Sequence, residues 1–447
     1  MYDPTDRRII HNAELTFHSL TGGSMPIRSL TDDALAAIDE RLTDTDALLA
    51  RGYPGDDGRR QPVHTAYLPA DRFTPNTART WGVAALTAAE EVGGVAAVAE
   101  IVGLAGDPAL ADLVRHKLGT EPLEDLRLDF EDGYGDRGDA AEDADVLAAA
   151  AAVSRSVADG TAPPFIGIRF KCFEAPTRAR GLRTLDLFLG ALVEAGPLPA
   201  GLTLTLPKVT TVGQVEAMVD VAGRLEQALD LPDGRLRFEV QVETPQVILG
   251  ADGTAPVARL IHAGAGRVSS LHYGTYDYSA SLGIAAQYQS MEHPAADHAK
   301  NVMQLAVAGT GVHLSDGSTN ILPIGDAAHV ADAWRLHARL VRRHLERGIY
   351  QGWDLHPAQL VTRYLATYAF YREGFAAAAT RLRNYVHKVD SAILDEPATA
   401  RALASFIHRG VTCGAVTAGE VASAAEVTVD TVRDLALNRP IQPQEIR

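Results

Sequence analysis

Acidic and basic side chains recur where short, strand-like apolar runs of this sequence end. They are Asp71, Asp129, Glu131, Asp132, Arg169, Lys171, Lys208, Glu243, Asp277, Asp316 and His356. Carboxylates that converge on one place repel each other, and a hard divalent cation such as Mg²⁺ or Mn²⁺ relieves that repulsion. Arg169 would supply fixed positive charge where an oxyanion develops during a reaction. A single carboxylate such as Asp316 would equally serve in a structural ion pair.

The runs themselves have the pattern of parallel strands that alternate with helices. Eight of them lie between residues 62 and 360: VHTAYLP, LRLDF, FIGIRF, LTLTLP, LRFEVQVE, VSSLHYG, GVHLSD and GWDLHP. Helical stretches separate them; one follows Thr211 and Gln214, whose spacing predicts a capping box. Alternating strands and helices indicate parallel βα units.

The polar face of these runs distinguishes a barrel from an open sheet. In LRLDFEDGY (126–134), Arg127, Asp129 and Glu131 alternate with apolar residues. A doubly wound sheet is covered by helices on both faces, whereas the inner face of a (β/α)₈ barrel can become polar toward its catalytic mouth. An antiparallel sheet with one solvent-exposed face would show the same alternation of polar and apolar residues, but the helical connections between the runs favour the barrel. We therefore predict an α/β fold, a (β/α)₈ TIM barrel, with these three side chains pointing inward.

The barrel is predicted to carry an addition at each end. Residues 1–60 would form an N-terminal helical extension, because one apolar stripe recurs at helical spacing before a Gly/Pro-rich linker. Residues 61–362 would be the catalytic barrel. Residues 363–447 read as helix throughout and would form a C-terminal helical tail that acts as a lid at the barrel mouth.

The composition excludes several classes of partner. A formal net charge of −16 is unsuited to nucleic acid or an anionic membrane, which both need a basic face. No apolar run is long enough to span a bilayer, and MYDPTDRRII lacks the apolar core of a secretory signal. Two cysteines indicate a reducing compartment. We expect a cytoplasmic enzyme; whether it forms a homo-oligomer stays open.

Six segments occur in the same order as in a known superfamily. They are TAYLPADRF (65–73), LDFEDGY (128–134), LPKV (206–209), VETPQVIL (242–249), YGTYDYSASLG (273–283) and LHPAQL (355–360). The chain resembles the citrate lyase β-subunit superfamily (HpcH/HpaI aldolase-like), which also holds malyl-CoA lyases, malate synthases and small pyruvate aldolases. The resemblance covers the predicted barrel.

This resemblance implies roles for the charged residues at the strand ends. Glu243 and Asp277 would ligate Mg²⁺, with Mn²⁺ as the alternative ion. Arg169 would bind the substrate carbonyl oxygen that becomes an enolate. Glu131 and Asp132 would take part in catalysis near the metal or its waters, together with the neighbouring aspartate of the same motif.

The resemblance also implies how a small carboxylate would be held. Backbone N–H groups from Gly274, Thr275 and Tyr276 would bind it, and Lys208 and His356 of the Pro-Lys and His-Pro motifs would contact the substrate. The chain also departs from the pattern of this superfamily, and these departures leave the identity of the substrate open. One of them is an insertion, GADGTAP, that follows the fifth-strand motif. The loop KCFEAPTRARGLRT (171–184) carries arginines that would either contact CoA phosphates or form a solvated basic loop.

The tail holds a further candidate. VDSAILDEPATARAL (389–403) resembles the segment in which malate synthases and malyl-CoA lyases place the acid/base group of a lid. Asp395 would be that group, with Glu396 as the second choice. Alternatively, Asp-Glu-Pro simply opens a helix, whose N-terminus favours acidic residues.

The function that follows is a Mg²⁺-dependent carbon–carbon lyase or condensing enzyme that acts through a metal- and arginine-stabilised enolate. Its substrate would be a 2-keto or 2-hydroxy acid, and the use of an acyl-CoA thioester stays open. Two alternatives remain: a pyruvate-class aldolase without CoA, and a non-catalytic barrel that binds a carboxylate.

Overall fold

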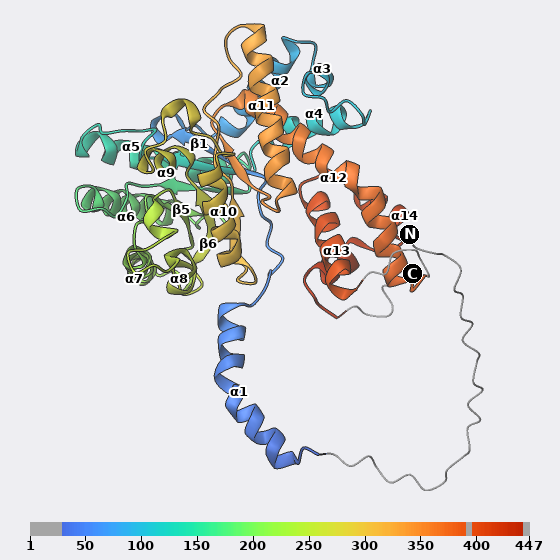
Figure 1. The fold of residues 1–447 in the computed structure, drawn as a ribbon. Coiled ribbons are helices and arrows are strands. Elements are labelled where there is room, and N and C mark those ends of the chain that lie inside the picture. The colour runs from blue at the N-terminus through green and yellow to red at the C-terminus, as the bar shows by residue number, and fades with distance from the viewer. Residues whose placement is uncertain (1–28, 390–395, 441–447) are drawn as a thin grey trace. The chain divides into compact units, whose positions relative to one another are not determined.

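The computed structural model describes residues 29–389 and 396–440. Eight parallel strands form one sheet in the order β7-β6-β5-β4-β3-β2-β1-β8 (Figure 1). Their bounds are β1 His64–Pro69, β2 Asp125–Asp129, β3 Phe165–Arg169, β4 Leu204–Leu206, β5 Phe238–Val242, β6 Val268–Tyr273, β7 His313–Ser315 and β8 Gly352–Asp354. A bridge between Ser315 and Gln351 joins β7 to β8, and the Trp353 N–H donates to the Gly317 carbonyl at 3.1 Å. The sheet thus closes into the predicted (β/α)₈ barrel.

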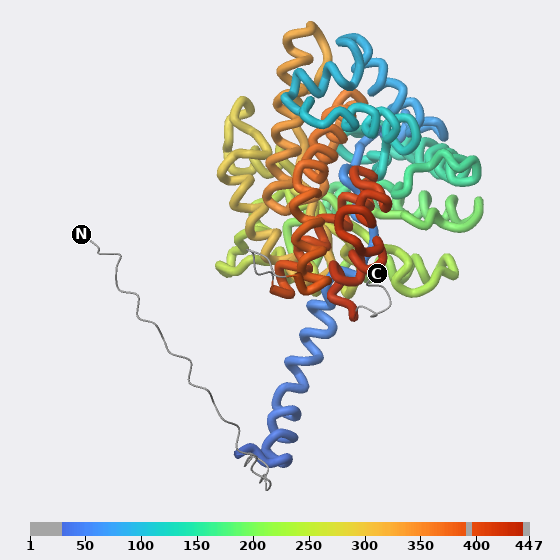
Figure 2. The backbone as a smooth tube through the Cα atoms, turned by 90° about the vertical axis from the view of Figure 1, so that its right-hand side faces the viewer, coloured from blue at the N-terminus to red at the C-terminus, as the bar shows by residue number. Residues whose placement is uncertain are grey.

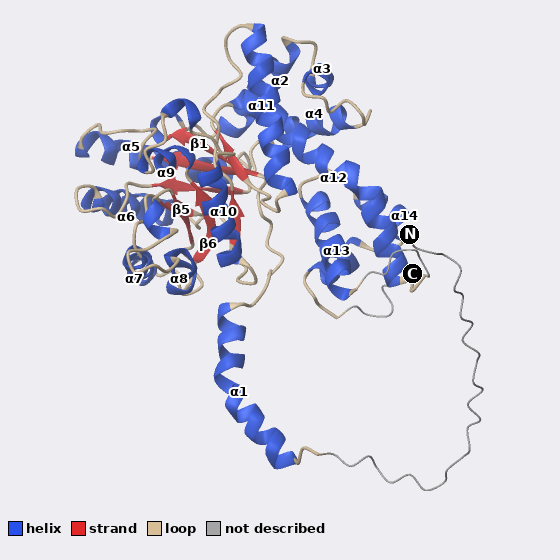
Figure 3. Cartoon of the chain, viewed as in Figure 1, coloured by secondary structure: helices blue, strands red, loops and turns tan. Residues whose placement is uncertain are grey.

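In the unit that begins at Gly52, helices surround the strands (Figure 3). The described helices also include α1, which belongs to the other unit. Their bounds are α1 Asp32–Gly52, α2 Thr77–Glu90, α3 Val95–Ile101, α4 Leu110–Thr120, α5 Asp139–Ala158, α6 Arg178–Ala195, α7 Val212–Ala228, α8 Pro256–Ala263, α9 Thr275–Ser281, α10 Pro294–Val307, α11 Ala327–Glu346, α12 Pro357–Val386, α13 Pro397–Thr412, α14 Ala418–Ala425 and α15 Val429–Ala436. The predicted capping box of Thr211 and Gln214 opens α7. Among the described helices, no single one is long and apolar enough to cross a membrane; the bent pair α2 and α3 meets that test only jointly.

The period of two in the strand sequences produces the two faces of the barrel wall. Leu126, Leu128 and Phe130 of the second strand run are completely buried and belong to the apolar core between strands and helices. The charged residues that alternate with them point into the barrel, as predicted, where they are buried as well.

The inward charges neutralise each other across the barrel. Arg127 of β2 forms an ion pair with Asp125 and, at 2.8 Å, with Glu239 of β5. The Thr205 hydroxyl donates to Glu239 at 2.5 Å. Burial would raise the pKa of Glu239, but Arg127 and His272 outweigh it and hold the pKa below its usual range. Arg127 is therefore a structural residue of the barrel interior.

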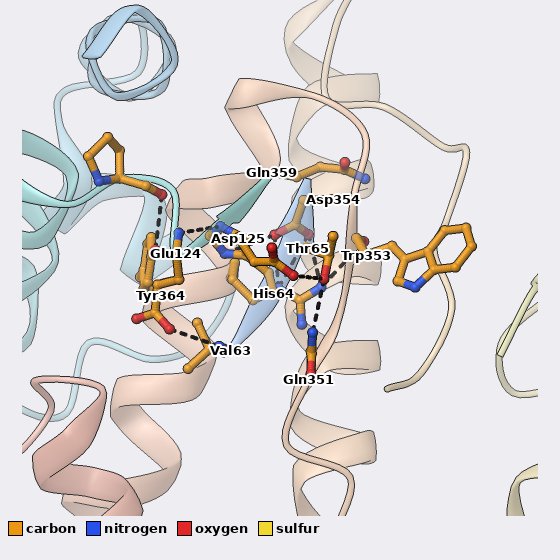
Figure 4. Close-up of polar contacts among 12 residues, drawn as sticks. Val63, His64, Thr65, Glu124, Asp125, Gln351, Trp353, Asp354, Gln359 and Tyr364 are labelled. Carbon is orange, nitrogen blue, oxygen red and sulfur yellow. Dashed lines mark hydrogen bonds and ion pairs between the residues drawn. The ribbon is translucent and has the colours of Figure 1, made fainter. Parts of the chain in front are cut away.

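A second buried polar network joins β1, β8 and α12 (Figure 4). Asp354 accepts hydrogen bonds from Arg363 at 2.9 Å and contacts Nε2 of His337 at 3.0 Å. Nδ1 of His64 lies 3.5 Å from the same carboxylate. Burial lowers the pKa of His64 to about 4, so this histidine is neutral at pH 7 and the negative charge of Asp354 is balanced by Arg363.

The predicted boundaries at residues 60 and 362 fall in different surroundings. Residue 60 lies in the segment between α1 and β1, eight residues after the compact unit that holds the barrel begins at Gly52. Residue 362 lies within α12, which continues across it without a break. In the tail, the Tyr368 hydroxyl of α12 donates to the Cys413 carbonyl at 2.8 Å. Helices α13 and α14 pack beside α12, and α15 packs against α13 (Figure 2). Arg409 of α13 donates at 3.0 Å to Gln61, which leads into β1. These contacts hold the tail helices against the barrel unit, and the lid role of the tail stays a prediction.

Candidate active site at the barrel mouth

A cavity of about 280 Å³ lies at the carboxyl ends of the strands. The residues that were predicted for the site and that line this cavity are Asp132, Arg169, Glu243, Gly274, Thr275, Tyr276 and Asp277. They come from β3 and from the segments that follow β2, β5 and β6. Catalytic groups of TIM barrels occupy this face, because the loops after the strands meet there.

Arg169 is held at the mouth by Asp129. Its Nε and Nη2 atoms donate to the two carboxylate oxygens at 2.7 Å and 2.6 Å. Asp129 also accepts the backbone N–H groups of Glu131 and Gly133. A Cβ atom at Gly133 would lie 2.5 Å from Oδ2 of Asp129, so only glycine allows the loop to wrap around this carboxylate. Arg169 thus has a fixed orientation, and its Nη1 faces Glu131 at 3.4 Å.

A lysine from the segment that follows β4, Lys208, links Glu131 and Asp132. Nζ of Lys208 lies 2.8 Å from Glu131 and 2.8 Å from Asp132. Burial opposes the charge of Lys208, but both carboxylates raise its pKa. The backbone of Lys208 is left-handed, with φ of 50°, a strained conformation for a residue with a side chain. Its N–H donates to Oε1 of Glu243 at 2.8 Å.

Glu243 is a buried carboxylate with too little positive charge around it. Its side chain is 2% exposed. Burial raises its pKa to about 8; Arg169 opposes this shift, and the nearby carboxylates Asp277 and Glu131 reinforce it. A cation that joined these carboxylates would relieve the repulsion, so the donor set fits a hard divalent ion with oxygen ligands.

The protein ligands would be few. Among the residues that the structure describes, no three His, Cys, Asp or Glu side chains are grouped so that they would hold a metal by themselves. Mg²⁺ in proteins is commonly held by one or two carboxylates and keeps several water ligands. Glu243 and Asp277, from β5 and α9, match that pattern in residue type and number.

The segment that begins α9 forms the wall next to Glu243. A Cβ atom at Gly274 would lie 2.4 Å from Cβ and 2.5 Å from Oε2 of Glu243, so glycine is needed for the close approach. The Thr275 hydroxyl donates to the Ser318 carbonyl at 3.2 Å. The Tyr276 hydroxyl accepts the Asn320 N–H at 2.6 Å. The first-turn N–H groups of a helix have no intrahelical acceptor, which leaves those of α9 available to a ligand.

Several charged residues at the strand ends have other partners. Asp71 pairs with Arg137 at 2.9 Å, and Lys171 with Glu142 at 2.6 Å. Asp316 pairs with the buried Lys300 at 2.9 Å. Each of these contacts is a structural ion pair, which is the alternative role that a single charged residue at a strand end can have. The sequence alone did not separate them from the site residues, because their partners lie on other elements.

Two further predictions concern histidine and the tail. His356 caps α12, where its Nδ1 accepts the Ala358 N–H at 3.2 Å, and it does not line the mouth cavity; its contact with a substrate stays a prediction. Asp395 lies outside the described residues. Glu396 is exposed and directly precedes α13, as expected for an acidic residue that opens a helix.

Two aromatic residues of the cavity wall were not singled out from the sequence. The rings of Tyr67 on β1 and Trp353 on β8 are 4.7 Å apart between centroids. The Arg169 guanidinium lies 4.9 Å from the centroid of Tyr67, close enough for a cation–π contact. Tyr67 lies within the TAYLPADRF motif, and Trp353 lies within the strand run GWDLHP. Their places in these two runs, which the sequence already predicted to be strands of the barrel, were the available signal.

The chain was compared with protein families and with curated proteins. The family model described as "Domain of unknown function (DUF6986)" matches residues 42–440. No curated protein matches the sequence.

Solved structures of similar fold share little sequence with the chain. A citrate lyase from Burkholderia xenovorans is 18% identical, with a TM-score of 0.54 over 81% of this chain and 96% of that one. A malate synthase from Haloferax volcanii in a magnesium and glyoxylate complex is 13% identical, with a TM-score of 0.47 over 86% and 99%. CitE from Mycobacterium tuberculosis, in complex with magnesium, acetoacetate and coenzyme A, is 18% identical, with a TM-score of 0.44 over 79% and 98%. The likeness to the citrate lyase, with its TM-score above 0.5, is a likeness of fold.

Proposed function

The chain belongs to the DUF6986 family, and from the chemistry of the barrel mouth we propose that it is a Mg²⁺-dependent carbon–carbon lyase or condensing enzyme. Its substrate would be a 2-keto or 2-hydroxy acid, handled with an acyl-CoA thioester. One observation carries the proposal: Glu243, whose pKa burial raises to about 8 with support from its acidic neighbours, shares a cavity with the fixed cation Arg169.

Arg169 would serve the oxygen at which charge develops. Asp129 occupies its Nε and Nη2 atoms, so Nη1, which faces Glu131 at 3.4 Å, is the atom that would donate to the substrate. In the condensing direction, a base takes a proton from the carbon beside the acyl carbonyl, and the electron pair moves to the carbonyl oxygen. That oxygen would accept from Arg169, which stays charged at any working pH. The new carbon nucleophile then adds to the keto carbon, whose oxygen takes up a proton.

Glu243 and Asp277 would hold the metal. A bound Mg²⁺ would polarise the keto group and offset the negative charge that grows there. The first-turn N–H groups of α9 would orient the carboxylate of the same acid. Asp395, or Glu396 in its place, would move the proton at carbon.

A second candidate, a pyruvate-class aldolase without CoA, is favoured by one observation. Arg180 and Arg183, which would have contacted CoA phosphates, form ion pairs with Asp143 at 2.7 Å and 2.6 Å. Both arginines lie in the first two turns of α6, and these pairs engage them within the protein itself. The third alternative, a barrel that only binds a carboxylate, would not need a buried glutamate such as Glu243 next to other carboxylates.

The test is an activity screen with and without Mg²⁺. Glyoxylate or pyruvate would be supplied with acetyl-CoA or propionyl-CoA, and loss of the thioester would be followed together with the acid product. Metal-dependent formation of a new acid with thioester consumption supports the condensing enzyme. Metal-dependent cleavage of a 2-keto acid without CoA supports the aldolase. Binding of these acids without turnover of any pair would contradict both.

A further inference from the structure

A second cavity, of about 170 Å³, lies at the opposite end of the barrel. Its wall consists of residues that precede or begin strands: Thr203 before β4, Arg235 and Arg237 before β5, and Ser269 and Ser270 in β6. It is separate from the mouth cavity, which is formed by residues at the carboxyl ends of the strands. The mechanism proposed above uses none of these residues.

The cavity wall is rich in arginine, and part of that charge has no acidic partner. Three lining arginines are paired: Arg59 with Asp57, Arg60 with Glu121 and Glu124, and Arg127 with Asp125 and Glu239. Within residues 29–389 and 396–440, neither Arg235 nor Arg237 forms an ion pair. Arg235 donates only to backbone carbonyls, at 2.5 Å to Pro199. Burial lowers its pKa, and Glu226 offsets this in part.

Buried donors in the same wall lack acceptors. Nε of Arg237 and the hydroxyl oxygens of Ser269 and Ser270 are buried and, among the described residues, have no hydrogen-bond partner. Ser270 is 5% exposed. The register between β5 and β6 shifts at Phe238 and Glu239, which pair with Val268 and Ser270. This irregularity leaves Ser269 as an extra residue. Such bulges redirect side chains, and both adjacent serines line the cavity.

The carboxylates of the wall cannot satisfy these donors, because their oxygens are already used. Asp125 accepts from Arg127 and, at 2.8 Å, from the Thr65 hydroxyl (Figure 4). Glu239 accepts from Arg127 and Thr205. A buried donor without an acceptor destabilises the folded state, and an arginine presents a fork of donors that matches oxyanions. What the wall lacks is an acceptor with negative charge.

We propose that the amino-terminal end of the barrel binds a small oxyanion, held by Arg235, Arg237 and the hydroxyl groups of Ser269 and Ser270. The cavity is below the range of about 300–1,000 Å³ that is usual for drug-sized ligands, so the ligand is a phosphate- or carboxylate-sized group. The site is independent of the function proposed for the mouth.

The test is calorimetry and thermal melting of the full chain without metal, with inorganic phosphate in one series and malate in another. Saturable binding with a rise in melting temperature is expected, because a ligand that binds only the folded state stabilises it. The series that binds more tightly identifies the phosphate or the carboxylate class. Arg237→Gln should weaken binding about tenfold or more, since it removes a charge-assisted contact.

Two further variants make the result specific. Arg224→Gln changes an arginine of α7 that is 75% exposed and should bind phosphate and malate as the parent does. Ser270→Ala serves if Arg237→Gln does not fold, and should also weaken binding. A cavity that holds only water would show no saturable binding of either anion, which would overturn the proposal. Equal affinity in Arg237→Gln, Ser270→Ala and the parent would also overturn it.

Discussion

Arg169 and Asp129 form a two-pronged ion pair, with Nε–Oδ1 and Nη2–Oδ2 distances of 2.7 Å and 2.6 Å. The two residues sit directly opposite each other in the register of β2 and β3. Asp129 is fixed in turn by two backbone N–H groups of its own loop. The pair therefore sets the direction of the guanidinium that β3 contributes to the mouth.

Arg169→Lys should lower turnover by about 10²–10³-fold, because a lysine cannot both bind Asp129 with two parallel hydrogen bonds and reach a developing oxyanion. Steady-state kinetics on the substrate pair found in the screen would measure this. Arg224→Lys is the matched control, since Arg224 pairs only with Asp220 on the surface of α7. Turnover at the parent rate in Arg169→Lys would contradict the role.

Glu243→Gln and Asp277→Asn should each abolish measurable Mg²⁺ binding in calorimetry, because each removes one of the two charged ligands. Asp252→Asn, in an exposed loop where Asp252 pairs with Arg259, should bind Mg²⁺ as the parent does. Unchanged affinity in both mouth variants would place the metal elsewhere.

Gly274→Ala should weaken Mg²⁺ binding without unfolding the protein. The added methyl group would lie 2.5 Å from Oε2 of Glu243, so the carboxylate must move away from its present position. Calorimetry measures the affinity, and circular dichroism checks the fold. Gly223→Ala in α7, where a Cβ meets nothing within 4 Å, is the control. Parent-like affinity in Gly274→Ala would show that the position of Oε2 does not matter for the metal.

Asp395→Asn should keep the affinity for metal and acid but lower the rate by about 10²–10⁴-fold, as expected for a general acid or base. Rapid-mixing or steady-state assays at saturating substrate separate rate from binding. If Glu396→Gln has this effect instead, the neighbour is the acid/base. If neither variant changes the rate, the group does not come from this segment.

Acidification should destabilise the protein through His64. Its pKa is about 4 in the folded state and about 6.5 in an unfolded chain, so the unfolded chain takes up the proton first. The stability contribution is present above about pH 6.5 and is lost as the pH falls toward 4, by up to about 1.4 kcal/mol per pH unit. Urea unfolding across this range measures it. His64→Gln should show a shallower slope, and an identical slope would assign the effect to other groups.

The barrel could be predicted because its signal is local. A strand exposes alternate residues to opposite faces, so LRLDFEDGY and LRFEVQVE reveal one apolar and one polar face without any knowledge of their neighbours. The eight runs, the capping box at Thr211 and the order of the motifs are of the same kind. They correctly indicated eight parallel strands and the end of the barrel at which Arg169, Glu243 and Asp277 meet.

The tertiary structure decided which charges belong to the mouth and which are structural. Arg127 pairs with Glu239, which lies 112 residues away, and Asp316 pairs with Lys300 on α10. The raised pKa of Glu243 likewise depends on its burial and on Asp277 and Glu131, which lie in the segments after two other strands. The position of α13–α15 depends on the direction in which α12 runs along the barrel, because α13 and α14 pack against α12. Each of these is a contact between segments distant in sequence, and the strength of a charge depends on its burial and its neighbours in space, which no short stretch of sequence contains.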